Sequence, residues 1–440
     1  MAHEVKHSKT SHLTTDDGNE DNKHKPQIYA KNSIDRFGDD LCALLLSYFP
    51  LEDHIRCESL SKQFRRTVFR SLLHITIDNK LMRQLPKSNI RQIMATIAIK
   101  CGNIETIDCR EINNIYKEHI PEVLTTFRDN CRHLRQIYCN LWRINSQTMR
   151  SFAPLITRID GIEYFADRDA ITHYHRLSHL RINSLRDVFD RHNGTLLAKN
   201  LHSFELNNYL KNDSDEHQLS AFVAQNLFLK SAVFMVYDTF HQLFQQFSRL
   251  TQLRDLRLSL WLTIGENSLS ESLRTIGLNC KQLQRLTLQF NTDIEFDDEI
   301  INGFNSHSLD SLRCYRRLKR LNLALHLYLN PEVLEPLTLC HRLTHLTLNS
   351  REMSDKLIVN CDKQWPRLQY LSIKTKAITR ECLHHISRLP ALQMLCLQCH
   401  YSNDLTDNGF YDVLSKSAKL KDIEFIENNT NRKILIIKRV

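Results

Sequence analysis

The stretch "CKQLQRLTLQFN" at residues 280–291 places cysteine, leucine and asparagine at fixed intervals. The pattern is C-x-x-L-x-x-L-x-L-x-x-N, made by Cys280, Leu283, Leu286, Leu288 and Asn291. Its last two leucines alternate with other residues, as on a short strand that buries one face. This stretch therefore predicts a strand that packs on a neighbour through its leucines.

The same frame recurs along most of the chain, with or without the cysteine. The first apolar residues of eleven clear matches are Ile104, Leu134, Leu177, Leu201, Leu253, Leu283, Leu318, Leu343, Leu368, Leu392 and Leu420. Weaker matches lie at 156–159 and 229–234. The period of about 26 residues falls in the leucine-rich range. Segments between the matches, such as "TRECLHHISRL" at 379–389, have apolar residues three and four apart, which indicates helices.

A strand and a helix that cannot bury their apolar faces alone must stack on neighbouring copies. The chain resembles the cysteine-containing leucine-rich repeat family, which implies an α/β fold with a curved solenoid. Its parallel strands would line the concave side and its helices the convex side. We expect this solenoid over 76–430, in about 12 to 13 repeats, with a capping strand at 431–440. Chance leucine patterning in an ordinary α/β protein is the alternative.

The region before the repeats has a different composition. Residues 1–32 are charged and histidine-rich, and we expect them to form a disordered tail. Residues 33–75 predict a helical domain. In "DDLCALLLSYF", apolar residues at helical spacing are Leu41, Leu44, Leu45, Tyr48 and Phe49. The following "EDHIRCESLSKQFRRTVFRSLL" offers one or two further short helices, with Leu72 at the end of their apolar side.

Three short helices ahead of a leucine-rich array resemble the F-box domain. Its first motif is matched by Phe37, Gly38, Asp40, Leu41, Leu45, Leu46, Ser47, Tyr48 and Phe49. Its second motif is matched by Leu60, Ser61, Lys62, Phe64 and Arg65. Gly38 stands where the family has proline, Asp40 replaces glutamate and Phe64 replaces tryptophan. The glycine weakens the start of the helix and bears on adaptor affinity.

The resemblance implies docking on a Skp-family adaptor and, through it, on cullin and RING subunits of a ubiquitin ligase. The residues expected to contact the adaptor are Phe37, Leu41, Leu45, Leu46, Phe49, Leu60 and Phe64. Burial of four such leucine or phenylalanine side chains, at about 1.5–3 kcal/mol each, can drive a stable interface. The alternative is that these helices only cap the end of the solenoid, as terminal repeats must.

Residues beside the second leucine of each frame are expected on the concave face. They are Arg257, Arg285, Arg320, His345, Tyr370, Lys374 and Met394, with Asp255, Asp422 and Glu424 at the margins. The basic side chains predict a site for an acidic or phosphorylated protein, because arginine forks suit oxyanions. The alternative is a solvated face of ordinary composition. The segment "RCYRRLKR" at 313–320 adds positive charge, which we place mainly on the loop that leads into its strand.

The remaining features narrow the class of protein. The net charge of +9 suits an acidic partner or a nucleic acid and selects neither. Thirteen scattered cysteines without a secretory signal predict reduced thiols in a cytoplasmic or nuclear protein that is not secreted. The apolar run Leu41–Phe49 is about half the length of a membrane span. We therefore expect no membrane partner.

Two cysteine and histidine clusters resemble chemical sites. Cys396, Cys399 and His400 have the form of a haem attachment motif, but they fall on a repeat strand. The cluster at 173–179, with three histidines, straddles a repeat boundary. We interpret both as ordinary repeat residues, and we expect no metal, cofactor or catalytic residue.

The predicted function is that of a substrate-recognition subunit of an SCF-type ubiquitin ligase, a non-catalytic role. The alternative is a leucine-rich-repeat interaction scaffold without a ligase role. Nucleic-acid binding rests on the positive charge alone, and we do not expect it.

Overall fold

The computed structural model describes two compact units, Met1–Ser71 and Leu72–Val440, and each is described here by itself. The described residues are 38–49, 51–86, 89–109, 111–112, 119–138, 146–160, 168–190, 192–210, 213–237, 241–261, 269–291, 307–325, 331–351, 353–401, 410, 413, 415–417, 419–428 and 432–437. The tail expected at 1–32 lies outside them.

The first unit contains three short helices, α1 (Asp39–Leu46), α2 (Leu51–Cys57) and α3 (Lys62–Arg70). Ser61 caps α3 by accepting a hydrogen bond from the backbone N–H of Phe64. The Asp39 carboxylate, in the first turn of α1, accepts a hydrogen bond from Gln63 on α3. The unit's interior is made by Cys42, Leu46, Phe64, Val68 and Phe69. In its described residues, this unit is therefore helical.

The second unit is built on one sheet of fifteen strands that pair in the order of the sequence. Strands β1 to β14 are parallel, and β15 pairs antiparallel with β14. Their bounds are β1 (His74–Thr76), β2 (Thr106–Asp108), β3 (Gln136–Tyr138), β4 (Arg158–Asp160), β5 (His179–Ile182), β6 (Ser203–Leu210), β7 (Ser231–Tyr237), β8 (Asp255–Trp261), β9 (Arg285–Asn291), β10 (Arg320–Leu325), β11 (His345–Ser350), β12 (Tyr370–Ala377), β13 (Met394–Tyr401), β14 (Asp422–Glu427) and β15 (Arg432–Ile437).

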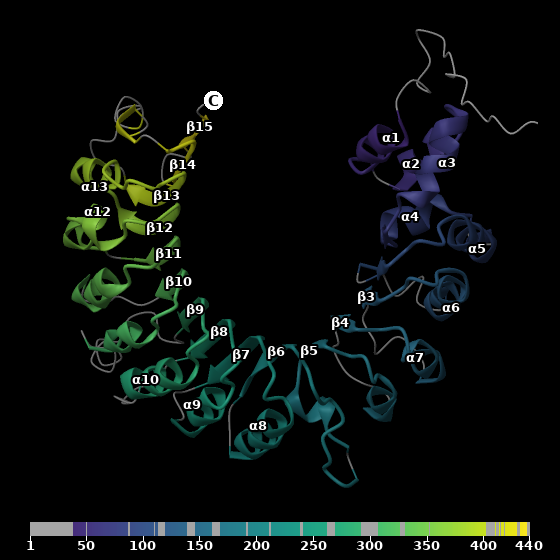
Figure 1. Cartoon of the computed structure of the whole chain (residues 1–440), viewed down its shortest axis with the longest axis horizontal. Coiled ribbons are helices and arrows are strands. Elements are labelled where there is room, and N and C mark those ends of the chain that lie inside the picture. Colours follow the sequence, from purple (N-terminus) through teal and green to yellow (C-terminus); the bar gives the residue numbers. More distant parts are fainter. Residues whose placement is uncertain are drawn as a thin grey trace, which may run out of the picture. The chain divides into compact units, whose positions relative to one another are not determined.

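Helices connect the strands and, in Figure 1, lie along the outer side of the curved sheet. The α-helices are α4 (Asn79–Gln84), α5 (Ile90–Lys100), α6 (Ile120–Asn130), α7 (Ser146–Phe152), α8 (Asp213–Gln225), α9 (His241–Ser248), α10 (Leu269–Asn279), α12 (Cys361–Gln364) and α13 (Arg380–Ile386). The 3-10 helices are η5 (Arg168–His173), η6 (Leu185–Val188), η7 (Asp310–Cys314), η8 (Pro331–Leu339) and η9 (Asp355–Leu357). This is the α/β leucine-rich-repeat solenoid that the sequence predicts.

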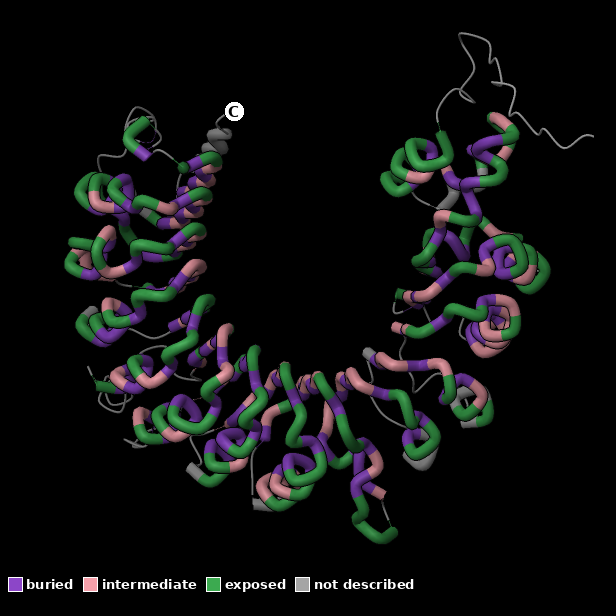
Figure 2. Tube along the Cα trace, viewed as in Figure 1, coloured by how far each residue is buried: buried purple, intermediate pink, exposed green. Residues whose placement is uncertain are grey.

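The core of the solenoid follows the leucine frame. The second leucine of each frame pairs in register with its counterpart on the next strand, as Leu286 does with Leu321 and Leu321 with Leu346. Wherever they are described, the two alternating apolar residues of each frame are buried, while the residues between them are exposed or half-buried (Figure 2). Every clear match of the frame therefore becomes a strand of the sheet.

The sheet begins earlier than the sequence analysis predicted. Strand β1 (His74–Thr76) pairs with β2, so the boundary between the units lies between Ser71 and Leu72, not after residue 75. Leu72, Ile75 and Ile77 are buried and repeat the L-x-x-L-x-L frame. Leu72 therefore belongs to the first repeat, and α3 ends at Arg70. At the other end, β15 occupies the place of the expected capping strand.

The recurring cysteine packs on the helix of the preceding repeat. The Cys131 thiol lies 3.7 Å from the carbonyl oxygen of Ala98, near the end of α5. The Cys280 thiol lies 3.4 Å from the carbonyl of Leu250, just after α9. The last carbonyls of a helix have no partner within that helix, and a thiol is a weak donor that can reach them. A small buried residue with a weak donor suits this position.

Candidate functional site

One face of α1 presents apolar side chains to solvent in the first unit. Leu41, Leu44 and Leu45 are exposed, Leu44 by 53%, and so are Tyr48 and Phe49 in the turn that follows. Their spacing places Leu41, Leu44 and Leu45 on the same side of the helix. We call these five residues the α1 apolar face. Exposed apolar groups gathered on one helix face mark interaction sites.

The seven residues expected to contact an adaptor divide into two groups. Leu41, Leu45, Phe49 and Leu60 are exposed. Leu46 and Phe64 are buried in the unit and hold its helices together, so they are not surface contacts in this structure. Helical spacing alone does not separate Leu45 from Leu46, because both lie next to the apolar stripe. Phe37 lies outside the described residues.

In the second unit, the residues expected on the concave face occupy three parallel rows that cross the strands. Arg285, Arg320, His345, Tyr370 and Met394 are direct neighbours in one row. A second row contains the residue that directly follows the second leucine of each frame, and Arg257 belongs to it. Lys374 lies in a third row, two residues further along the strands than the second. All seven residues are half-buried or exposed, as the alternation of the frame predicts.

The positive charge on this face is smaller than the residue types indicate. Asp255 is buried and accepts a hydrogen bond of 2.8 Å from Arg285, and its other oxygen lies 3.9 Å from Arg257. One carboxylate therefore partly neutralises two of the expected arginines. Burial, and the neighbouring charge of Arg320, lower the pKa of His345 below its usual value. His345 is thus neutral at physiological pH.

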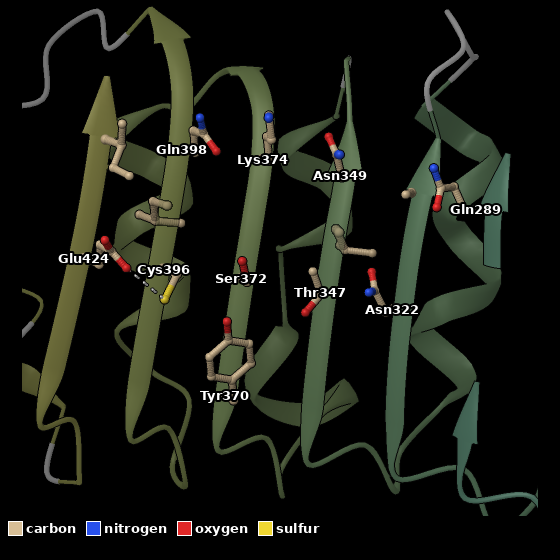
Figure 3. A pocket seen from close by; sticks show the side chains of 14 residues that line it. Gln289, Asn322, Thr347, Asn349, Tyr370, Ser372, Lys374, Cys396, Gln398 and Glu424 are labelled. Atoms are coloured by element: carbon tan, nitrogen blue, oxygen red, sulfur yellow. Dashed lines mark hydrogen bonds between the residues drawn. The ribbon is translucent and has the colours of Figure 1, made fainter. Parts of the chain in front are cut away.

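Towards the C-terminal end, the inner face of the sheet is hollowed into a shallow cavity of about 470 Å³. Amide and hydroxyl side chains from β9 to β13 line it, and Figure 3 shows them side by side on neighbouring strands. They are Gln289, Asn322, Thr347, Asn349, Tyr370, Ser372 and Gln398. Lys374 and Glu424 add one positive and one negative charge. The cavity is suited to a ligand with many hydrogen-bonding groups and little net charge.

Two contacts order one side of this cavity. His345 and Tyr370 stack with ring centroids 5.8 Å apart. The Cys396 thiol lies 4.0 Å from Glu424 Oε2, the contact dashed in Figure 3. Burial raises the pKa of Tyr370, so its hydroxyl keeps its proton. The site therefore offers a neutral donor and acceptor beside the Glu424 carboxylate.

Sequence reasoning missed an aromatic cluster at the ends of three neighbouring strands. Tyr209, Tyr237 and Trp261 are half-buried, and Tyr237 and Trp261 stack with their centroids 6.3 Å apart. The rings of Trp261 and Tyr209 are nearly perpendicular, with their centroids 5.6 Å apart. Trp261 Nε1 is buried without a hydrogen-bond partner in the described part of the chain. Tyr237 and Trp261 directly follow the last buried position of their strands, and Tyr209 directly precedes the buried Leu210 at the end of β6. The leucine frame could have supplied this signal.

The two clusters that resemble metal or haem sites fit the repeats instead. On β13, Cys396 points to the cavity and Cys399 is buried, so the two thiols lie on opposite faces of the strand. His179 is half-buried on β5 and is in contact with the Ser178 hydroxyl, while His173 and His175 are exposed. Among the described residues, no three cysteine, histidine, aspartate or glutamate side chains are grouped to hold a metal ion.

Within the described ranges, no helix combines the length and apolarity needed to cross a membrane.

Comparisons with known proteins add only distant likenesses. No protein-family model matches the chain, and no curated protein matches it. Among solved structures, it is similar to an internalin from Listeria monocytogenes at 11% identity, over 89% of this chain and 95% of that one, with a TM-score of 0.36.

Two further solved structures are similar at low identity. The Rad7–Elc1 complex from yeast is 14% identical, over 89% of this chain and 98% of that one, with a TM-score of 0.47. The leucine-rich repeat-containing protein LegL7 from Legionella pneumophila is 14% identical, over 82% and 92%, with a TM-score of 0.35. The leucine-rich-repeat fold of this chain rests on its own strand order and repeated frame.

Proposed function

We propose that this chain is the substrate-recognition subunit of an SCF-type ubiquitin ligase. The first unit acts as an F-box that docks on a Skp-family adaptor, and the solenoid holds a target protein. The observation that carries this proposal is the α1 apolar face, since five large apolar side chains stay exposed in a unit with its own buried interior. Full burial of each contributes about 1.5–3 kcal/mol to an interface.

The solenoid supplies the target site in this proposal. Its inner face offers the amide-lined cavity of β9 to β13 and, further towards the N-terminus, the aromatic cluster of Tyr209, Tyr237 and Trp261. Tyrosine, tryptophan and arginine are the residues that most often dominate binding energy at interfaces. An extended polypeptide with polar side chains fits the cavity better than a strongly acidic one, because Lys374 is balanced by Glu424.

The chain takes no chemical part in the reaction that we propose. Target lysines would be held close to a ubiquitin-charged enzyme on other subunits, so the acceleration comes from proximity. The expected setting is the cytoplasm or the nucleus, where such complexes work on protein targets.

The test is co-purification with a Skp-family adaptor. We expect the wild-type chain to bind and a Leu41→Asp, Leu45→Asp double variant to lose at least about a hundredfold in affinity. Both residues are exposed, so the variant keeps its fold, which circular dichroism would verify. Ile99→Asp on α5, a more exposed apolar position, is the control and should bind like the wild type.

A second candidate function is an interaction scaffold without a ligase role. It is favoured by the same solenoid surfaces and needs no adaptor. Absence of adaptor binding by the wild-type chain would overturn the ligase proposal and leave the scaffold. Equal loss in the Ile99→Asp control would also count against docking through α1.

A further inference from the structure

We propose that the edge of the sheet where β9 to β11 begin is a second docking surface, for an acidic protein segment that carries a large apolar side chain. This surface lies in the turns before the strands, apart from the inner-face cavity. It goes beyond the proposed function, since it would exist whether or not the chain binds an adaptor.

Positive side chains are concentrated at this edge. Six exposed cations from three successive turns define the basic edge, namely Lys281, Arg313, Arg316, Arg317, Lys319 and Arg342. The segment at 313–319, which precedes β10, supplies four of them. Neighbouring strands lie about 4.8 Å apart, so cations on adjacent turns act on the same ligand.

Hydrogen bonds fix the three turns relative to one another. The Lys319 N–H donates to the carbonyl of Gln284 at 2.9 Å, and the Thr344 N–H donates to the carbonyl of Lys319 at 2.8 Å. Arg317 donates to the Gln282 side chain in the preceding turn, and Arg342 reaches back to the carbonyl of Arg316 at 3.4 Å. The basic edge is thus a continuous surface rather than a set of separate side chains.

A cavity of about 640 Å³ opens in the middle of the basic edge, between the end of α10 and the turn at 313–317. Leu278, Leu283, Cys314 and Tyr315 form its apolar walls. Leu278 is 51% exposed, although the neighbouring Leu283 is buried in the core. No carboxylate is among the described residues that line the cavity. An apolar cavity rimmed by cations is complementary to an apolar side chain flanked by carboxylates.

The dipole of α10 explains the presence of only some of the cations of the basic edge. The partial negative charge of a helix end favours cations within its last turn. Lys281 directly follows the end of α10 and can benefit, but Arg313, Lys319 and Arg342 lie before the strands of later repeats. The nearby carboxylates of the described chain already have partners, since Asp255 binds Arg285 and Asp310 binds His307.

The apolar cavity favours a protein over a nucleic acid as the occupant. Single-stranded nucleic acids bind through exposed aromatic rings that stack on bases. The one aromatic residue at this cavity, Tyr315, is buried, and its hydroxyl donates to the carbonyl of Leu273 at 2.7 Å. An aliphatic side chain such as leucine can contact Leu278 and Cys314, and glutamates beside it can reach the arginines.

The test uses the full chain and three fluorescent probes, with binding followed by fluorescence anisotropy. The first probe is a short peptide with one leucine flanked on both sides by glutamates. The second replaces its leucine with serine, and the third is a single-stranded oligothymidylate. We expect the leucine peptide to bind most tightly, with an affinity that falls as salt is raised.

Three variants identify the surface. Arg313→Glu with Arg316→Glu should weaken the leucine peptide at least about tenfold, because two favourable contacts become repulsive. Leu278→Ser should weaken the leucine peptide about threefold to tenfold and leave the serine peptide unchanged. Arg132→Glu changes an exposed arginine at the equivalent position of another repeat, and it should have no effect.

Four results would overturn the proposal: no binding of the leucine peptide, tighter binding of the oligothymidylate, equal binding of the two peptides, or equal weakening by Arg132→Glu. Sedimentation at increasing concentration tests a second copy of the chain as the occupant. Self-association that the Arg313→Glu, Arg316→Glu variant abolishes would replace the acidic partner with that copy.

Discussion

Gly277 is a single residue on which the packing of two repeats depends. A Cβ atom at this position would lie 2.9 Å from the Cβ of Cys314 and 3.0 Å from the Tyr315 ring, which is held by its hydrogen bond to Leu273. We expect Gly277→Ala to lower the free energy of unfolding by about 1–3 kcal/mol, more than the helix-propensity gain of about 1 kcal/mol. Chemical denaturation would measure it.

Gly102→Ala is the control for this prediction. Its Cβ would meet only the carbonyl oxygen of Asn130, at 3.6 Å, which is an ordinary contact. A Gly277→Ala variant as stable as the Gly102→Ala variant would show that α10 and η7 can move apart at no cost.

Asn226 joins two repeats through its buried side chain. The amide donates to the carbonyls of Phe222 and Ala198, and its oxygen accepts from the N–H of Leu201 at 2.8 Å. Asn226→Ala would leave these buried groups without that partner, and we expect a loss of roughly 2–3 kcal/mol in unfolding free energy. Asn279→Ala, which removes a hydrogen bond to the same helix at the surface, should change it by less than about 0.5 kcal/mol. Equal losses would contradict this role.

Individual residues were harder to predict than the frame they belong to. The spacing of Leu45 and Leu46 on α1 does not show that the first is exposed and the second buried, because that depends on where α3 packs. The charge of Arg257 and Arg285 was visible in the sequence, but their shared carboxylate, Asp255, was expected only at the margin. Ion pairs between neighbouring strands depend on which side chains lie next to each other. The frame predicts these neighbours only for its leucines.

At the scale of elements, alternation predicted the strands well because one buried face fixes their register. The same frame begins at Leu72, but residues up to 75 were expected in the helical domain, since a strand of three residues carries little alternation. Within the described ranges, five connections form 3-10 helices, among them η8, which contains Pro336. Proline removes a backbone donor from the interior of a helix, and a 3-10 segment is a short alternative.

The closing strand β15 covers the edge of β14 and is itself the last strand of the sheet. It pairs antiparallel with β14 over its full length, from Asp422 with Ile437 to Glu427 with Arg432. An unpaired edge strand is a template for association with other chains. We expect removal of residues 432–440 to cause concentration-dependent association, measured by light scattering. Removal of 438–440 alone leaves the pairing intact and should leave the chain monodisperse, and association in both truncations would count against an edge effect.

At the scale of the whole molecule, the buried thiols of the repeats act together because burial shifts their pKa values in the same direction. Burial raises the pKa of Cys101, Cys280, Cys340 and Cys361 to about 12, from an ordinary value near 9. The folded chain therefore keeps these protons at a pH where the unfolded chain has released them. Between those two pKa values, the folded state binds more protons than the unfolded state.

This difference makes the solenoid lose stability in alkali. Because the unfolded state binds fewer protons above pH 9, the free energy of unfolding falls as pH rises, while below about pH 8 it is independent of these groups. Each thiol contributes up to about 1.4 kcal/mol per pH unit.

Urea denaturation from pH 7 to pH 10, followed by circular dichroism, would measure the slope. Tyrosine and lysine also titrate near pH 10, so the slope must be compared with that of a Cys280→Ala, Cys340→Ala variant. That variant should be less stable at pH 7 but show a shallower fall above pH 9. An unchanged slope would mean that the thiols titrate normally and that the repeats open locally around them.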